Sequence, residues 1–417
     1  MSVTLTDLYG AGRLPQAKAR RESVISGFVK TFGAAPEALF SAPGRTEIGG
    51  NHTDHQHGRV LAASVDLDVF AAAAPNQSGM IRVQSQGYPL MVVDLAELNP
   101  VPGEENTSTA LIRGVAARMA ALGCPLQGAG LDAYVVSNVP GGSGLSSSAA
   151  FEVLLGTMLN DLFWGGRCSA VEIAQIGQYA ENVFFGKPCG LMDQTASSVG
   201  SVVAIDFKDP AAPVVEKIDF DFAAAGYGLC ILDSGADHAD LTDEYAAITS
   251  ELGAVSRCFG REVLRDVPEE EFMANLPRVR KAAGDRGTLR AFHFYAENRR
   301  ALEEAEALKK GDFEGFLELV RASGRSSALY LQNVVPTGQT TNQELLFTIA
   351  LCEKLLEGRG AARVHGGGFA GTAQAFVPID LLPEFKARTE AVLGEGSCHV
   401  LSIRAVGGTR VESGGIL

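Results

Sequence analysis

The glycine-rich segment at residues 140–150 limits the fold of this chain more than any other feature, because it joins a predicted strand to a predicted helix. It reads Pro-Gly-Gly-Ser-Gly-Leu-Ser-Ser-Ser-Ala-Ala. The run LDAYVVS at 131–137 predicts the strand, and the apolar pattern from Leu145 onward predicts a long helix. Glycines let a ligand approach the backbone, and the unpaired amides of a helix N-terminus favour an anion. The segment predicts a phosphate-binding loop, although a serine-capped flexible turn fits the same residues. No Lys-Ser or Lys-Thr follows the glycines, so it is not a Walker P-loop.

Residues 45–58 form a second concentration of polar side chains, RTEIGGNHTDHQHG. Paired donors and acceptors between glycines suit a polyol or a sugar. Two other interpretations remain open for this segment. The imidazoles of His52, His55 and His57 could hold a transition metal, or the segment could be an exposed polar loop.

Two further segments carry candidate chemistry. In residues 181–194 (ENVFFGKPCGLMDQ), Asp193 falls near the start of a predicted helix and could be either catalytic or a helix cap. Residues 364–372 (VHGGGFAGT) match GxGxxG literally at Gly366, Gly368 and Gly371. The following TAQAFVP alternates like a strand instead of opening a helix, so a dinucleotide-binding fold is not expected.

Short apolar runs predict strands at 202–206 and 227–233, and helical spacing predicts helices over about 170–184 and 298–310. The mixed order of predicted strands and helices indicates an α+β protein. A length of 417 residues suits two domains, which we place at 1–206 and 207–417. With 35 basic and 49 acidic side chains the net charge is −14, which argues against a nucleic-acid partner. We expect no transmembrane helix, because no apolar run reaches about 18 residues. No signal peptide is evident, and seven scattered cysteines without CxxC spacing suggest a reduced, cytoplasmic enzyme.

Together the four segments resemble the galactokinases of the GHMP kinase superfamily, from FVKTFGAAPEALFSAPGRTEIGGNHTDH to GGGFAGTA. The resemblance implies an N-terminal domain like domain 2 of ribosomal protein S5 and a C-terminal ferredoxin-like domain, with ATP and sugar between them. It implies ATP and Mg²⁺ as cofactors, and a sugar 1-phosphate as product. It assigns catalysis to Asp193 and Arg45, Mg²⁺ binding to Ser148 and Glu181, and sugar binding to Asn51, His52, Asp54, Gly190 and Tyr245. It assigns the nucleotide phosphates to Gly141, Gly142, Ser143, Gly144, Leu145, Ser146, Ser147 and Ser148.

The chain also departs from the family signature, which reads close to GRVNLIGEHTDYNGG. Asn51 stands where the family has a glutamate that contacts the sugar's C6 hydroxyl, and His55, Gln56 and His57 replace a Tyr-Asn-Gly run. Ala370 replaces a glycine of the third motif, and PTGQTTNQ at 336–343 replaces an acidic segment. An amide at position 51 removes the repulsion that a glutamate would exert on a uronate. We therefore expect a galactose kinase, with a kinase for a C6-modified sugar such as galacturonate as the alternative, and a sensor without turnover as a third possibility. The oligomeric state stays open, and a monomer is compatible with the sequence.

Overall fold

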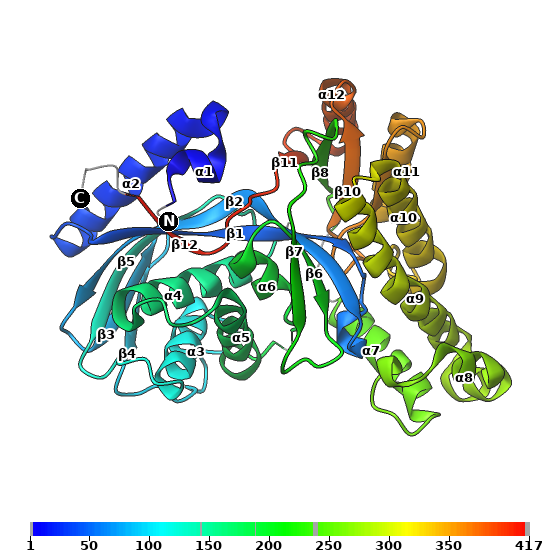
Figure 1. Cartoon of the computed structure of the whole chain (residues 1–417), viewed down its shortest axis with the longest axis horizontal. Helices are drawn as coiled ribbons and strands as arrows, with labels where there is room; N and C mark the ends of the chain where they lie inside the picture. Colours follow the sequence, from blue (N-terminus) through cyan, green and yellow to red (C-terminus); the bar gives the residue numbers. More distant parts are fainter. Residues whose placement is uncertain (1–2, 142–143, 188, 237–240, 413–417) are drawn as a thin grey trace.

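The computed structural model describes residues 3–141, 144–187, 189–236 and 241–412, which form two sheets with helices packed on them (Figure 1). The helices are α1 (Leu5–Tyr9), α2 (Leu14–Phe32), α3 (Ser108–Ala121), α4 (Ser147–Trp164), α5 (Ala170–Ala180), α6 (Met192–Val199), α7 (Thr242–Arg257), α8 (Glu269–Ala274), α9 (Leu276–Lys310), α10 (Phe313–Ser326), α11 (Glu344–Leu356) and α12 (Leu382–Leu393). The strands are β1 (Ala38–Gly49), β2 (Arg59–Asn76), β3 (Met80–Ser85), β4 (Leu90–Asp94), β5 (Gly130–Ser137), β6 (Val202–Asp206), β7 (Val214–Ile218), β8 (Tyr227–Asp233), β9 (Ala361–Val364), β10 (Thr372–Pro378), β11 (Cys398–Leu401) and β12 (Thr409–Val411).

The first sheet is built around β1 and β2, which pair antiparallel. Within the described residues its strand order is β12-β1-β2-β5-β3-β4. The N-terminal end of β2 also pairs with β6, and β6 pairs with β7. All twelve residues of β1 are buried. The pairing shifts register between Pro43 and Arg45 and again between Glu47 and Gly49. Such bulges redirect side chains, and here the Arg45 side chain reaches Asp193 whereas the Glu47 side chain reaches Arg363 of β9.

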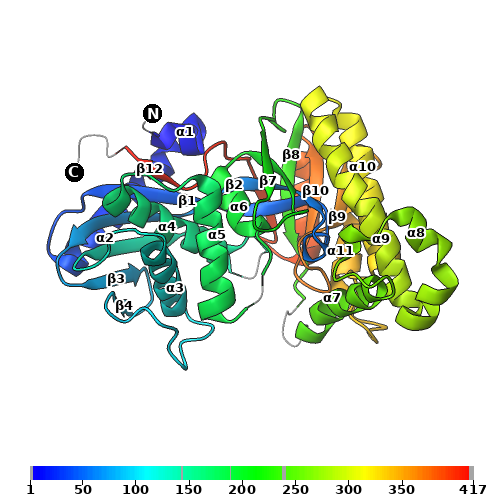
Figure 2. The ribbon, with the colours of Figure 1, turned by 60° about the horizontal axis from the view of Figure 1, so that its bottom comes forward.

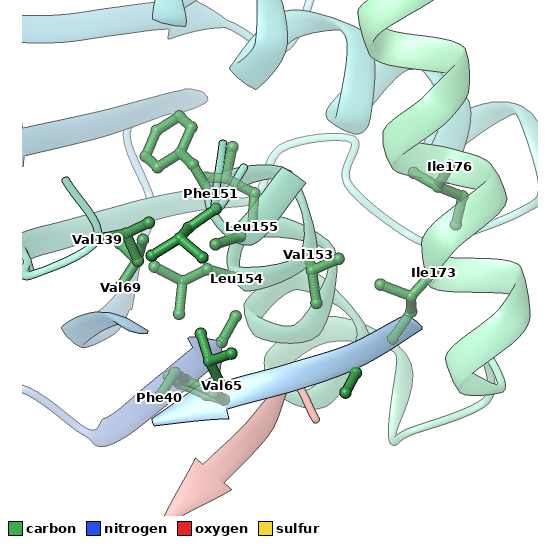
Figure 3. Packing of buried hydrophobic residues seen from close by; sticks show 14 of the residues in the cluster. Phe40, Val65, Val69, Val139, Phe151, Val153, Leu154, Leu155, Ile173 and Ile176 are labelled. Atoms are coloured by element: carbon green, nitrogen blue, oxygen red, sulfur yellow. The ribbon is translucent and has the colours of Figure 1, made fainter. Parts of the chain in front are cut away.

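Both faces of this sheet are covered by helices (Figure 1). Because side chains alternate along a strand, Leu39 packs beneath α1 and α2 with Val24 and Phe28, whereas Phe40 faces α3, α4 and α5. Figure 3 shows the second of these cores, in which Leu154 and Leu155 of α4 lie against strand residues. The buried α4 is thus held rigidly on the sheet, and its N-terminus carries the predicted phosphate loop.

The second sheet has the order β11-β8-β10-β9, with every neighbouring pair antiparallel. Following the chain, this is the 4-1-3-2 arrangement of a ferredoxin-like unit in which α7 to α11 form one crossover and α12 the other. Phe316 of α10 packs on one face, and Cys352 of α11 and Phe385 of α12 pack on the other. Figure 2 shows α9 and α10 beside this sheet, on the side away from α4 and α5. The predicted α+β class is therefore confirmed.

Several predicted elements agree with the structure and others need adjustment. β6 and β8 have the predicted bounds, whereas the predicted helix at 298–310 is the end of the much longer α9. The helix predicted to reach Phe184 ends at Ala180 and continues as a π-helical turn over Glu181–Phe185. The division at residue 206 stays a prediction, and β7 and β12 from the second half pair within the first sheet. No helix of the described segments is long and apolar enough to span a bilayer.

The two chain ends are tied to the first sheet through the buried carboxylate of Asp68. Arg404 Nη1 lies 3.0 Å from Asp68 Oδ2, Tyr9 donates its hydroxyl to the same oxygen at 2.6 Å, and Arg20 binds the other oxygen. Burial opposes the ionised form, but Arg20 and Arg404 outweigh it, so the pKa of Asp68 lies below its usual value. Arg404 is itself fully buried and depends on Asp68 for its counter-charge.

We predict that Asp68→Ala lowers the free energy of unfolding by about 3–5 kcal/mol, because it leaves the Arg404 charge buried and unpaired. Chemical denaturation measures this loss. Asp161→Ala is the matched control, since its pair with Arg410 is solvent-exposed and should contribute about 1 kcal/mol or less. Equal losses in the two variants would contradict the role assigned to Asp68.

Candidate active site

Arg45 and Asp193 form the centre of the site, although 148 residues separate them. Arg45 Nε lies 2.7 Å from Asp193 Oδ1 and Nη2 lies 2.6 Å from Oδ2, a bidentate pair. The Ser146 hydroxyl donates to Asp193 Oδ2 at 2.8 Å, and Arg45 Nη1 binds the carbonyl oxygen of Gly144. Both oxygens of Asp193 are thus held by side chains of other elements, so its principal contacts are not those of a helix cap. One guanidinium joins the phosphate loop to the start of α6.

The environment keeps Asp193 ionised. Burial opposes the charged form, but the charge and hydrogen bonds of Arg45, together with Ser146, outweigh it and hold the pKa of Asp193 below its usual value. The carboxylate keeps 29% of its surface exposed, so it can still face a ligand. A fixed, ionised and accessible carboxylate can orient a hydroxyl group or accept its proton.

The predicted phosphate loop precedes α4 as expected. Gly142 and Ser143 lie outside the described residues. Gly144 adopts φ +70°, Leu145 is buried, and Ser146 adopts φ +56° as the residue preceding the helix. Gly141 is exposed, whereas Ser147 and Ser148 are half-buried in the first turn. The N-terminus of an 18-residue helix with no acidic side chain in its first turn is favourable for an anion.

Glycine at position 44 permits the close approach of β1 to this loop. A Cβ there would stand 2.9 Å from the Leu145 carbonyl oxygen, the same atom that accepts the Arg45 backbone N–H at 2.9 Å. The glycine before Arg45 is therefore required by packing between strand and loop.

The predicted metal ligand Glu181 lies in a buried acidic pair. The Gln194 amide nitrogen donates at 2.9 Å both to Glu181 Oε2 and to Glu152 Oε2. Burial, and then the charge of Glu181, raises the pKa of Glu152 well above its usual value. Glu152 Oε1 has no hydrogen-bond partner among the described residues, and Lys187 Nζ is 3.6 Å from Glu181 Oε1. These hard oxygen donors, short of positive charge, fit a magnesium ion, which needs few protein ligands when phosphates supply the others.

Two of the predicted sugar-binding residues contact the 366–371 loop, and two others lie against each other. His52 bonds through Nε2 to the Gly367 carbonyl at 2.9 Å, and the Tyr245 hydroxyl donates to the Gly368 carbonyl at 3.0 Å. Asp54 lies against Gly190, where a Cβ would stand 2.2 Å from Asp54 Oδ2. Burial, with the nearby His55, lowers the pKa of His52 to about 4, so its imidazole is neutral at pH 7. The structure thus brings these four positions to one region with neutral and acidic groups.

Asn51 lies in the same segment but differs from these residues in being 1% exposed. Its amide nitrogen donates to Glu47 Oε1 at 3.0 Å and to the Gly366 carbonyl at 2.7 Å. Its amide oxygen accepts from Asn333 at 2.9 Å and from the Ser327 hydroxyl at 3.3 Å. The nitrogen and the oxygen of the Asn51 side-chain amide therefore both already have protein partners.

The loop at 366–371 has a role that its sequence did not indicate. It joins β9 to β10, as the alternating TAQAFVP predicted, and its carbonyl groups bind side chains of the 45–58 segment. His365, just before it, bonds to Thr46 and to Thr372 at 3.0 and 2.9 Å. The glycine pattern and its resemblance to the third family motif were the sequence signals for this loop, and no sequence signal singled out Glu152, Gln194 or His365.

The transition-metal interpretation of the three histidines gains no support. Over the parts of the chain that the structure describes, no three His, Cys, Asp or Glu side chains are grouped as a metal site. His52 instead bonds to a carbonyl, and the 45–51 stretch is buried, which also excludes an exposed polar loop there.

Comparison with known proteins agrees with this geometry. The family model of the GHMP kinases N terminal domain matches residues 110–201, and the galactokinase galactose-binding signature matches residues 26–75. The galactokinase of Streptomyces coelicolor is 33% identical over 363 residues, which cover 84% of this chain and 87% of that protein.

Solved structures show the same relationship. The Lactococcus lactis galactokinase complexed with galactose superposes with a TM-score of 0.79 and 26% identity, covering 93% of this chain and 99% of that one. The Methanococcus jannaschii mevalonate kinase superposes with a TM-score of 0.61 at 15% identity over 88% and 98% of the two chains, which shows the shared fold alone. The phosphate loop, the signature segment and the glycine loop thus occupy one site in a chain that belongs to the galactokinase family of the GHMP kinases.

Proposed function

We propose that the protein transfers the γ-phosphoryl group of ATP to the anomeric hydroxyl of galactose, giving galactose 1-phosphate and ADP. The observation that carries the proposal is the Asp193 carboxylate, clamped by Arg45 and Ser146 between the phosphate loop and the 45–58 segment. The family membership, and the galactose bound to the Lactococcus lactis relative, support the substrate.

Asp193 orients the attacking hydroxyl and accepts its proton. Because its pKa is lowered, it acts mainly by position, and Arg45 keeps it ionised while adding positive charge beside the transferring group. Phosphoryl transfer depends largely on such positioning and charge neutralisation.

ATP is expected to place its phosphates at the loop 141–148, facing the N-terminus of α4. Ser148 and Glu181 would hold Mg²⁺, which neutralises phosphate charge when bound. The acidic pair around Gln194 supports this assignment of the metal.

For the sugar, we assign contacts to His52 and Tyr245, which bond to carbonyl groups of the 366–371 loop, and to Asp54 and Gly190, which lie against each other. Asn51 belongs to the same segment, but any sugar contact would require it to exchange one of its present partners. The enzyme is further inferred to work in a reducing, cytoplasmic setting. All seven cysteines lie within the described residues and are free thiols there, which supports this inference.

An ADP-release assay with a panel of sugars tests the proposal. Galactose should give the highest kcat/KM among galactose, glucose and galacturonate. A higher kcat/KM for galacturonate than for galactose would identify a C6-modified sugar as the substrate instead. Binding of sugar and ATP without ADP release would favour a sensor.

Replacing Asp193 by asparagine should lower kcat by about 10²–10⁴-fold, because it removes a positioned proton acceptor. Steady-state kinetics measure the loss, and calorimetric titration should show that ATP still binds. A folded Asp193→Asn variant with near-normal turnover would exclude the catalytic role.

The Arg45→Gln variant should change the pH dependence of kcat/KM. Without the guanidinium, burial raises the pKa of Asp193 with less opposition, so the acid limb should move to higher pH by about 1–3 units. In the parent enzyme Asp193 stays ionised down to pH values below its ordinary pKa, so activity should not fall through this group above about pH 4. An unchanged acid limb in Arg45→Gln would show that Arg45 does not set the charge of Asp193.

Glu181→Ala and Ser148→Ala should each raise the Mg²⁺ concentration needed for half-maximal activity by about tenfold, with little change in galactose KM. Glu172→Ala on α5 is the matched control, because Glu172 is an exposed member of a capping box with Ser169. If both site variants needed the same Mg²⁺ concentration as the parent for half-maximal activity, the metal would lie elsewhere.

A further inference from the structure

A buried polar interface joins residues 46–51 to the C-terminal half of the chain. His293 and Glu297 of α9 bond to the backbone of Asn51 and Gly50, at 2.9 Å and 3.1 Å respectively. Gln374 of β10 donates to the Thr46 hydroxyl at 2.7 Å and to the Glu47 carbonyl at 2.9 Å. The segment that leads into His52 and Asp54 is therefore held by side chains of the other half.

The side chain of Asn51 fits this interface in only one polarity. Its nitrogen faces two acceptors, Glu47 Oε1 and the Gly366 carbonyl. Its oxygen faces two donors, from Asn333 and Ser327. A carboxylate of the same shape would place an oxygen against the two acceptors, which is unfavourable at a buried position.

Glu47 is the carboxyl group that the Asn51 side chain contacts directly. It is 5% exposed, and its Oε1 accepts from the fully buried Arg363 at 2.7 Å and from Asn51 at 3.0 Å. Burial raises the pKa of Glu47 to about 7 against the opposing charges of Arg363 and Arg45. Arg363 is the cation paired with Glu47, so a second carboxylate at position 51 would be added without a further cation for it.

Resting on the proposed function, we infer that Asn51 does not recognise the C6 group of the sugar. Asn51 is instead a positioning residue that acts as the neutral hydrogen-bond partner of Glu47 and fixes the segment from which His52 contacts the 366–371 loop and Asp54 contacts Gly190. The contact between positions 47 and 51 accommodates a single carboxyl group, which is the one at position 47.

A four-protein cycle tests this: the parent, Asn51→Asp, Glu47→Gln, and the double variant. Asn51→Asp is nearly isosteric and should lower Tm by about 5 °C or more. Galactose kcat/KM should fall about tenfold or more, while the KM for ATP stays within about twofold. The double variant, in which amide and carboxylate have exchanged places, should recover more than half of the Tm loss. Asn106→Asp, at an exposed asparagine, is the matched control and should change neither quantity.

The ratio of kcat/KM for galactose to that for 6-deoxygalactose distinguishes a positioning role of Asn51 from direct recognition of the sugar's C6 group. We expect this ratio to stay within about threefold in Asn51→Asp and in the double variant. A change of tenfold or more in either variant, or an Asn51→Asp protein as stable as the parent, would overturn the inference.

Asn333→Ala provides a second route if Asn51→Asp does not fold. Asn333 is fully buried and donates to Asn51 and to the Gly367 carbonyl, so its loss should raise galactose KM with ATP KM and the sugar ratio unchanged. An unchanged galactose KM would contradict the positioning role. The Tm measurements on the four proteins do not depend on enzyme activity. If the parent had no sugar kinase activity, the proposed function would be refuted, but the Tm values would still show whether positions 47 and 51 are paired.

Discussion

The guanidinium of Arg45 is the group on which the rest of the site depends. It binds both oxygens of Asp193 and the carbonyl of Gly144, while the backbone N–H of the same residue binds Leu145. Strand β1, residues 144–145 before helix α4, and helix α6 thus meet at a single residue. The charge has a thermodynamic consequence as well as a geometric one. Without it, burial would favour the protonated form of Asp193, and the carboxylate would lose its ability to accept a proton.

A second constraint is the polar interface between the two halves of the chain. Buried charges are stable only when they are paired and hydrogen-bonded, and here Glu47 with Arg363 and Glu297 with Arg300 satisfy that condition. Because His52 and Asp54 follow directly after this interface, their positions depend on the contacts that hold residues 46–51.

Much of this architecture could be predicted from sequence where local pattern decides it. The apolar runs of β6 and β8 and the glycine loop before α4 have strong local signals, and the resemblance of the motifs indicated that they meet. Long-range contacts were out of reach. Asn51 and Asn333 are 282 residues apart, so nothing near position 51 could show that its amide is already bonded. The same holds for Gln194 between two carboxylates and for the return of β12 to the first sheet.

The most direct test of the whole account is phosphorus NMR of the products formed from ATP and galactose. The account predicts ADP and one sugar phosphate whose phosphorus couples to the anomeric proton, in equal amounts. Inorganic phosphate as the only new phosphorus species, or a phosphorus coupled to the protons at C6, would contradict it.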